Sequence, residues 1–323
     1  MNNIKFTVII PLFNKAEHIL RTLNSVAWQK YPAAEIIVID DGSRDDGALI
    51  VKNANMKNVR LIHQANQGVS AARNNGVALA SHEYIAFLDA DDQWLPLFLD
   101  EVARLILKFP QAKFFGTSYQ IVESENTYSD AKIVIQIMLT IGTLYCLSLH
   151  TIVLDDYFKI ASQGDLPFTM SSMVIQQSLF NSIGGFPLDE PIGEDQDLFC
   201  RVALNTDIAY SPNIHSLYHK DAQNQASKNN IPSTECGFSI RITREANMNP
   251  KMKNVANMLK YSATHLCHLA KLNIGDGHFS QARKLLSDPR CKLKPKHLVG
   301  LYGLSWIKQT EQWLSRLLRY SRV

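Results

Sequence analysis

Three carboxylates follow a short apolar run in the stretch AFLDADDQW. Tyr84 to Leu88 has the composition of a buried strand, and Asp89, Asp91 and Asp92 come directly after it. Two carboxylates one residue apart cannot both lose their water and stay charged unless a cation accompanies them. Mg²⁺ or Mn²⁺ is such a cation, since it takes one or two protein carboxylates and completes its shell with water and phosphate oxygens. Asp89 and Asp91 therefore indicate a site for a metal ion and a diphosphate.

A simpler explanation of these acids stays open at this point. Asp91 or Asp92 could cap a helix that begins near Leu95, with the other carboxylates in solvent. A second acidic cluster, GEDQD at residues 193–197, precedes an amphipathic run, and acids in the first turn of a helix often serve only its dipole. Neither cluster establishes chemistry by itself, so the choice depends on what surrounds them.

Strand-like and helical segments alternate from Phe6 to Leu88. Continuous β-branched runs at residues 6–12 and 35–39 predict strands that are covered on both faces, and further strands are expected at 59–63 and 83–88. Helices are expected between them: after a capping-box spacing from Asn14 to Glu17, over 44–55, and over 68–80, entered through Gly68. This order is typical of a parallel sheet with helices on both faces.

Ligands of such sheets bind beyond the carboxyl ends of the strands. Polar residues follow these strand ends in the sequence: Asn14, Asp40, Asp41, Asn66, Asp89 and Asp91. The dinucleotide fingerprint GxGxxG does not follow the first strand, and the P-loop pattern GxxxxGK followed by Ser or Thr does not occur. The sequence therefore predicts a polar, acidic site that would bind a nucleotide by other means.

Four stretches, in their order and spacing, resemble the family 2 glycosyltransferases with the GT-A fold. They are VIIPLFNKAEHILRTLNSV, EIIVIDDGSRDDG, NQGVSAARNNGVALASHEYIAFLDADD, and MVIQQSLFNSIGGF followed by GEDQDLFCR, and the resemblance covers about the first 220 residues. It implies an α/β fold with a Rossmann-like, mixed, mainly parallel sheet and helices on both faces. It also implies a nucleotide-sugar donor, most often a UDP-sugar, with Mn²⁺ or Mg²⁺ as cofactor and inversion at the anomeric carbon.

By position, the resemblance implies a donor pocket near the first two strand ends. Pro11 and Phe13 would line the base and ribose, Asp41 would hydrogen-bond the uracil edge, and Arg73 would lie near the nucleotide. The chemistry of Asp41 agrees, because an ionised carboxylate accepts the N–H that uracil presents, whereas an adenine edge would not offer the same pairing. Standing alone, Asp41 and Gly42 would be explained by an ordinary Asp-Gly turn.

The resemblance also implies the metal ligands. Asp89 would face the ribose, Asp91 would be the more direct metal ligand, and His219 would be a further metal or diphosphate contact. A surface histidine is the alternative for His219, since the sequence YHKDAQNQAS departs from the Tyr-Arg-x-His type of segment that is frequent in the family. The polar stretch 221–232 would suit a mobile loop that orders over the donor.

The second acidic cluster is implied to act on the acceptor. Asp195 would be the base that takes the proton from the acceptor hydroxyl, and Glu194 would orient the acceptor or the base. Inversion requires such a base on the sugar face opposite the leaving diphosphate. Gly184, Gly185 and Phe186 would shape the acceptor pocket. We therefore expect a metal-dependent inverting glycosyltransferase that acts on a saccharide or lipid-linked saccharide in cell-surface polysaccharide or lipopolysaccharide biosynthesis.

Two alternatives differ from this expectation in class. A degenerate relative would bind nucleotide-sugar or glycan without turnover, but it predicts a loss among Asp41, Asp91 and Asp195, and all three are acidic. A sugar nucleotidyltransferase needs a Gly-rich loop with Arg and Lys after the first strand, which PLFNK at residues 11–15 does not supply. We expect no nucleic-acid partner, because the net basic charge is confined to the C-terminal tail.

Beyond about residue 232 the resemblance ends, and apolar periodicity predicts helices at residues 252–272, 279–286 and 296–320. The expected domains are a catalytic domain, 1–232, and a helical region, 233–323. The segment from Arg290 to Val323 has eight Lys or Arg and one acid, and Trp306 and Trp313 share an apolar face of the last helix. Two explanations stay open: this helix packs on the catalytic domain, or it lies on an anionic membrane surface.

The composition of the 323 residues, 46% of them hydrophobic with a formal net charge of +3, is that of a globular protein with a large core. Five scattered cysteines without a CxxC pair indicate a reducing compartment, and the N-terminus has no signal-peptide pattern. We expect a cytoplasmic protein, at the inner face of the plasma membrane if the last helix is interfacial. Residues 133–154 lack charges over a length that could span a bilayer, but polar interruptions favour a buried segment.

Overall fold

The computed structural model describes residues 4–124, 127–130, 151–164, 166–190, 192–220 and 231–320. Most of the uncharged segment 133–154 and most of the polar stretch 221–232 lie outside the described residues. The chain divides into two compact units, Met1–Asp155 with Asp165–Gln223, and Asp156–Gly164 with Asn224–Val323. The second unit thus includes a short segment from much earlier in the sequence. The domain limit expected at residue 232 stays a prediction.

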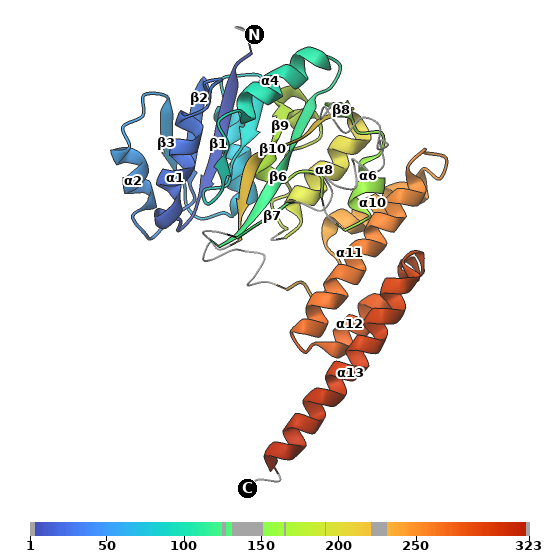
Figure 1. Ribbon diagram of the computed structural model, residues 1–323. Coiled ribbons are helices and arrows are strands. Elements are labelled where there is room, and N and C mark those ends of the chain that lie inside the picture. Colours follow the sequence, from blue (N-terminus) through green and yellow to red (C-terminus); the bar gives the residue numbers. More distant parts are fainter. Residues whose placement is uncertain are drawn as a thin grey trace. The chain divides into compact units, whose positions relative to one another are not determined.

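The first unit contains a mixed sheet with the strand order β3-β2-β1-β4-β9-β6-β10-β5 (Figure 1). Its strands are β1 Phe6–Leu12, β2 Glu35–Asp40, β3 Val59–His63, β4 Tyr84–Phe87, β5 Gln93–Trp94, β6 Phe114–Ser124, β9 Met173–Gln176 and β10 Ile208–His219, with β7 Thr127–Asp130 beside β6 and β8 Ile152–Val153 beside β10. The strands β1 to β4 are parallel, and β9 runs antiparallel between β4 and β6. The predicted α/β fold is confirmed.

Helices cover both faces of this sheet because successive strand residues point to opposite sides. The helices are α1 Ala16–Ala27, α2 Gly47–Asn53, α3 Val69–Leu79, α4 Phe98–Lys108, α7 Gln177–Ser182 and α8 Glu194–Asn205, with the 3₁₀ turn η2 Met170–Ser172. Val38 of β2 belongs to the same buried cluster as Leu23 of α1. Its neighbours Ile37 and Ile39 pack with Ala72 of α3. The two faces of β2 are therefore buried under different helices.

The start of α1 differs from the predicted capping box. Lys15 precedes the helix, and no side chain caps the N-terminus of α1. Asn14 has a positive φ of 51° and links two loops instead. Its N–H donates to Ser43 Oγ at 3.1 Å, and its Oδ1 accepts the N–H of Arg44 at 2.8 Å. The backbone direction at Asn14 thus depends on the distant loop at residues 43–44. This direction sets the position from which the Lys15 side chain extends.

The second unit is helical. Its elements are α6 Tyr157–Ala161, α10 Gly237–Met248, α11 Val255–Gly275, α12 Phe279–Leu286, the 3₁₀ turn η3 Pro289–Leu293, and α13 Pro295–Tyr320. The segment around α6 is bonded to α11: Asn257 donates to Asp156 at 2.6 Å, and the Thr264 hydroxyl donates to the Ser162 carbonyl at 2.8 Å. The predicted C-terminal helical region is confirmed, and α10 adds to it. Within the described ranges, no helix combines the length and the apolar character that a membrane span requires.

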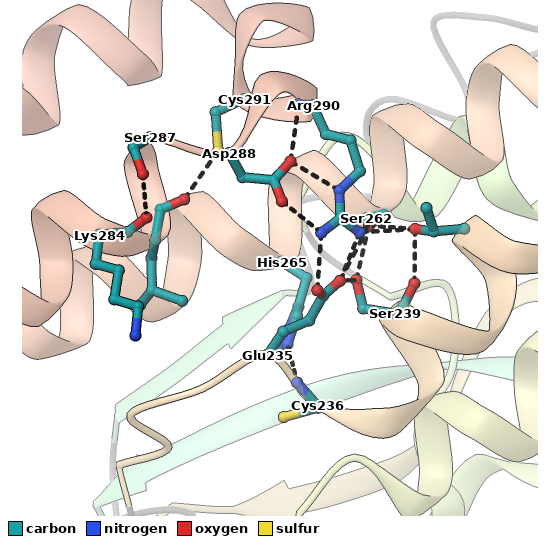
Figure 2. Close-up of polar contacts among 12 residues, drawn as sticks. Glu235, Cys236, Ser239, Ser262, His265, Lys284, Ser287, Asp288, Arg290 and Cys291 are labelled. Carbon is teal, nitrogen blue, oxygen red and sulfur yellow. Dashed lines mark hydrogen bonds and ion pairs between the residues drawn. The ribbon is translucent and has the colours of Figure 1, made fainter.

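Arg290 ties together three segments of the second unit (Figure 2). Its guanidinium donates to both oxygens of Glu235, at 2.6 and 2.7 Å, and to both oxygens of Asp288, at 2.9 and 2.8 Å. It also donates to the hydroxyls of Thr243 and Ser262, at 2.7 and 2.6 Å. Largely buried ion pairs stabilise a fold when every group has a partner, as here. The network therefore holds the residues before α10, and η3, against α11.

Replacing Arg290 with methionine should lower the free energy of unfolding of the second unit by about 3 kcal/mol, because two partly buried carboxylates lose their cation. Lys308→Met is the matched control, since Lys308 and Glu311 are 53% and 57% exposed and such pairs contribute under about 0.5 kcal/mol. Urea unfolding followed by circular dichroism measures both. Equal losses in the two variants would contradict the role of Arg290.

Candidate active site

Arg73 of α3 joins the two acidic clusters of the sequence. Its Nη2 lies 2.7 Å from Asp89 Oδ1, and its Nη1 lies 3.0 Å from Glu194 Oε1. The side chain is only 4% exposed, and the guanidinium lies over the Phe186 ring, 5.3 Å from its centroid. Burial by itself would lower the pKa of Arg73, but the charges of Asp89 and Glu194 outweigh it and raise the pKa above its usual value. The predicted donor and acceptor sides thus share one fixed positive charge.

Asp195 has the electrostatic character of a base. The helix α8 begins after Gly193, whose φ of 90° favours glycine, and its first turn contains Glu194 and Asp195. Burial and then the neighbouring charge of Glu194 raise the pKa of Asp195 to about 7. Its Oδ1 accepts the N–H of Gln196 at 2.7 Å. A carboxyl group with a pKa near 7 is suited to accept a proton at neutral pH.

Asp92 holds the loop of residues 89–92 in place through hydrogen bonds inside the protein. Its side chain is buried, and it accepts the Ser171 hydroxyl at 2.5 Å and the His219 N–H at 3.0 Å. Burial, followed by the charges of Asp91 and Asp89, raises the pKa of Asp92 well above its usual value. Ser171 Oγ also accepts the N–H of Asp89 at 3.1 Å. The helix-cap alternative is wrong, because α4 has no side-chain cap and the Asp92 carboxylate faces Ser171 and β10.

Asp91 has a partner that the sequence did not reveal. Lys15 Nζ lies 2.7 Å from Asp91 Oδ2, and the two side chains are only 13% and 14% exposed. Arg21 Nη2 donates to the Asp91 carbonyl oxygen at 2.8 Å. No spacing rule connects residues so far apart in the chain. The only available signal was that Lys15 follows the first strand, where the other site residues also gather.

Asp41 organises the loop that leads into α3. Its side chain is buried and accepts the N–H groups of Gln67 and Gly68, both at 2.8 Å, and the side-chain amide of Gln64 at 2.7 Å. The Gly68 N–H therefore bonds to Asp41 where the chain turns into the helix. The contact of Asp41 with uracil stays a prediction.

Pro11 and Phe13 lie beside this loop at the end of β1. The N–H of Asp41 donates to the carbonyl of Leu12 at 2.8 Å, which places the ends of β1 and β2 side by side. Phe13 is exposed, so a flat aromatic surface borders the acidic edge. Pro11 and Phe13 therefore lie at the same sheet edge as Asp41, and their role in a base and ribose pocket stays a prediction.

Gly185 and Phe186 form a tightly constrained turn below Arg73. Asn74 binds both sides of the Phe186 backbone, accepting its N–H and donating to its carbonyl, each at 2.9 Å. Gly185 has a φ of 64°, and a Cβ there would lie 2.8 Å from Asn74 Oδ1. The Phe186 ring is buried, and its edge packs on Phe87 with 5.5 Å between centroids. This turn supports Arg73, and its contact with an acceptor stays a prediction.

The acids at this edge fit a metal ion that arrives with oxygens of its own. Among the residues with a described placement, no three His, Cys, Asp or Glu side chains gather as a metal cage. A diphosphate-bound Mg²⁺ or Mn²⁺ needs only one or two protein carboxylates, and Asp91 and Asp89 can supply them. His219 is buried, and its Nε2 lies 2.8 Å from Gln93 Oε1. To bind a metal ion, Nε2 must therefore give up its hydrogen bond with Gln93. The metal roles of Asp91 and His219 stay predictions.

Known proteins resemble this chain in sequence. The family model described as Glycosyl transferase family 2 matches residues 7–165. YibD of Escherichia coli (strain K12), an uncharacterized glycosyltransferase, is 42% identical over 106 residues, which are 32% of this chain and 31% of YibD. AmsB of Erwinia amylovora, an amylovoran biosynthesis glycosyltransferase, is 34% identical over 99 residues, which are 29% of this chain and 33% of AmsB. The chain therefore spans about a third of the length of these curated relatives.

Solved structures share the fold. The crystal structure of S. aureus TarS 1-349 in complex with UDP-GlcNAc superposes with a TM-score of 0.66 at 19% identity, covering 99% of this chain and 92% of that one. A second crystal structure of S. aureus TarS 1-349 gives a TM-score of 0.63, also at 19% identity, with the same coverage. The GT-A fold with a helical C-terminal region, as predicted, is confirmed. The resemblance to glycosyl transferase family 2 that the sequence predicted is confirmed over residues 7–165, where the family model matches.

Proposed function

We propose that the protein is a metal-dependent inverting glycosyltransferase that moves a sugar from a UDP-sugar to a saccharide hydroxyl in cell-surface polysaccharide or lipopolysaccharide biosynthesis. One observation carries this proposal: Arg73 connects Asp89, on the donor side, to Glu194, the neighbour of the expected base Asp195. Relatives named as glycosyltransferases, and a TarS structure with UDP-GlcNAc, support the donor class. The name of AmsB supports polysaccharide biosynthesis.

Asp195 takes the proton of the acceptor hydroxyl as the hydroxyl oxygen attacks the anomeric carbon. Its pKa of about 7 leaves a substantial ionised fraction at neutral pH and still gives it the affinity to hold the proton. The charge of Glu194 contributes to that pKa, and Arg73 fixes the Glu194 carboxylate. Attack from the side of Asp195, opposite the leaving diphosphate, inverts the anomeric carbon.

Asp91 would hold Mn²⁺ or Mg²⁺, with Asp89 beside it and His219 as a further ligand. The metal ion would stabilise the negative charge that develops on the departing diphosphate. Asp89 keeps its orientation through Arg73 and through its backbone bond to Ser171. Asp41, Pro11 and Phe13 complete the donor site at the uracil and ribose.

The helix α13 provides a surface for an anionic membrane in this proposal. Trp306 and Trp313 lie seven residues apart on one side of the helix and are 56% and 62% exposed. Ile307 and Leu314 follow each of them and are exposed as well. The segment from residue 290 onward has eight Lys or Arg and one acid. Exposed tryptophans next to basic residues suit the headgroup region of anionic lipids, where a lipid-linked acceptor would be found.

Asp195→Asn should lower donor turnover by about 10²- to 10⁴-fold without weakening donor binding, because an asparagine keeps the shape but takes no proton. The assay is hydrolysis and equilibrium binding of UDP-, GDP- and dTDP-sugars with and without Mn²⁺. We expect UDP-sugars to bind best, and with Mn²⁺. Wild-type rates in Asp195→Asn would exclude this base, and donor binding without any turnover by the wild-type protein would instead favour the degenerate-relative alternative.

The rate should fall as the pH drops through about 7, because Asp195 accepts a proton only when ionised. Glu194→Gln removes the like charge that raises this pKa, so the acidic limb should move to lower pH. Carboxyl ¹³C NMR of labelled aspartates follows the same titration without any turnover. An acidic limb that stays in place in Glu194→Gln would contradict the coupling of these two residues.

Replacing both Trp306 and Trp313 with serine should reduce binding to vesicles that contain phosphatidylglycerol by about tenfold, because two large apolar side chains no longer enter the headgroup region. Vesicle flotation measures the bound fraction. Trp28→Ser is the matched control, since Trp28 is 69% exposed on the first unit. Unchanged flotation of the double variant would contradict the role of α13 in membrane binding.

A further inference from the structure

Lys15 contacts the carboxylate that the proposed metal site needs. The Lys15–Asp91 distance of 2.7 Å and the low exposure of both side chains, 13% and 14%, distinguish this pair from the solvent-exposed pair Lys308–Glu311. Water screens charges poorly at such a shielded position, so the ammonium neutralises much of the Asp91 charge. A divalent ion that binds Asp91 must therefore compete with a cation that belongs to the protein.

The loop that contains Asp91 is held by its backbone, so Lys15 is not needed to keep its shape. Arg21 donates to the Asp91 carbonyl at 2.8 Å, and the Thr22 hydroxyl bonds to the carbonyls of Ala90 and Asp92 at 2.9 and 2.8 Å. Lysine, in contrast, places its charge at the end of a flexible four-carbon chain. Lys15 can therefore release the Asp91 carboxylate while the loop keeps its position.

We propose that Lys15 is a placeholder cation, which pairs with Asp91 in the absence of metal and moves to the donor diphosphate when a divalent ion takes Asp91. The proposal rests on the proposed function, because the diphosphate belongs to the nucleotide donor. The exchange breaks no covalent bond: Lys15 gives up one anionic partner and gains another, in a charge-assisted hydrogen bond. A metal ion alone gains less, because it displaces the Lys15 ammonium from Asp91 without offering it the oxygens of a diphosphate.

This exchange makes metal and nucleotide binding cooperative. The diphosphate offers the displaced ammonium a second anionic group in place of Asp91, so each ligand raises the affinity for the other by the same factor. Lys15 thus favours metal that arrives with a diphosphate over free metal. In this role it is a positioning residue for the metal and the leaving group.

The test is a titration of the full chain with Mn²⁺, read by electron paramagnetic resonance of free Mn²⁺, with and without UDP. Lys15→Met should bind Mn²⁺ alone more tightly, on the order of tenfold, and the factor by which UDP enhances Mn²⁺ binding should fall by a similar amount. Lys15→Arg, which keeps the charge, should stay close to wild type. Lys52→Met, on the exposed side of α2, is the control.

The double variant Lys15→Met with Asp91→Asn should lose the gain in Mn²⁺ affinity, which locates the effect at Asp91. Mn²⁺ should also raise the melting temperature of Lys15→Met more than that of wild type, which shows that the variant is folded. Lys15→Met that binds Mn²⁺ no more tightly than wild type overturns the proposal. A protein that never binds UDP overturns the proposed function, and with it the move of Lys15 to a diphosphate, whereas Mn²⁺-dependent UDP-sugar turnover together with no gain in Mn²⁺ affinity in Lys15→Met overturns the placeholder role alone.

Discussion

A buried guanidinium must keep its carboxylates within bonding distance, and Arg73 imposes this constraint on the site. An unpaired charge at such a position is unfavourable by several kcal/mol, so neither Asp89 nor Glu194 can move away independently. Asp89 follows β4, whereas Glu194 begins α8 much later in the chain. One side chain of α3 therefore fixes the spacing between two parts of the site that are distant in sequence.

The crowded carboxylates at this edge avoid mutual repulsion in three different ways. Asp89 pairs with Arg73, and Asp91 pairs with Lys15. Asp92 is withdrawn into the protein, where a hydroxyl and a backbone N–H satisfy it. Asp195 has a raised pKa, so it holds a proton for part of the time near neutral pH. The carboxyl groups therefore differ in charge and exposure, which allows neighbouring acids to have separate roles.

The sequence predicts those parts of the structure that follow from periodicity. The strand-like runs of β1 to β4 and the apolar stripes of α11 to α13 have regular patterns, and the structure contains these elements close to the expected residues. The positions of acids after β2 and β4 were also predictable, since parallel strands end at one edge.

The remaining features depend on contacts between residues that are far apart in sequence. The bond from Ser171 to Asp92 and the pair of Lys15 with Asp91 have no local signature. Local spacing was misleading at Asn14, whose side chain binds the backbone of a distant loop instead of capping the adjacent helix. The burial of Asp92 could not be predicted either. Asp89 and Asp91 are aspartates in the same short stretch, yet only Asp92 of the three is buried.

The interleaved chain of the second unit limits how this protein can be rearranged by recombination. Tyr157 and Phe158 of α6 pack against Tyr261 of α11, although the intervening sequence returns to the first unit. No single crossover point between two genes would transfer the helical unit intact. Any exchange that yields a folded chimera must carry both segments from the same parent, so the two units are expected to be inherited together rather than shuffled as separate cassettes.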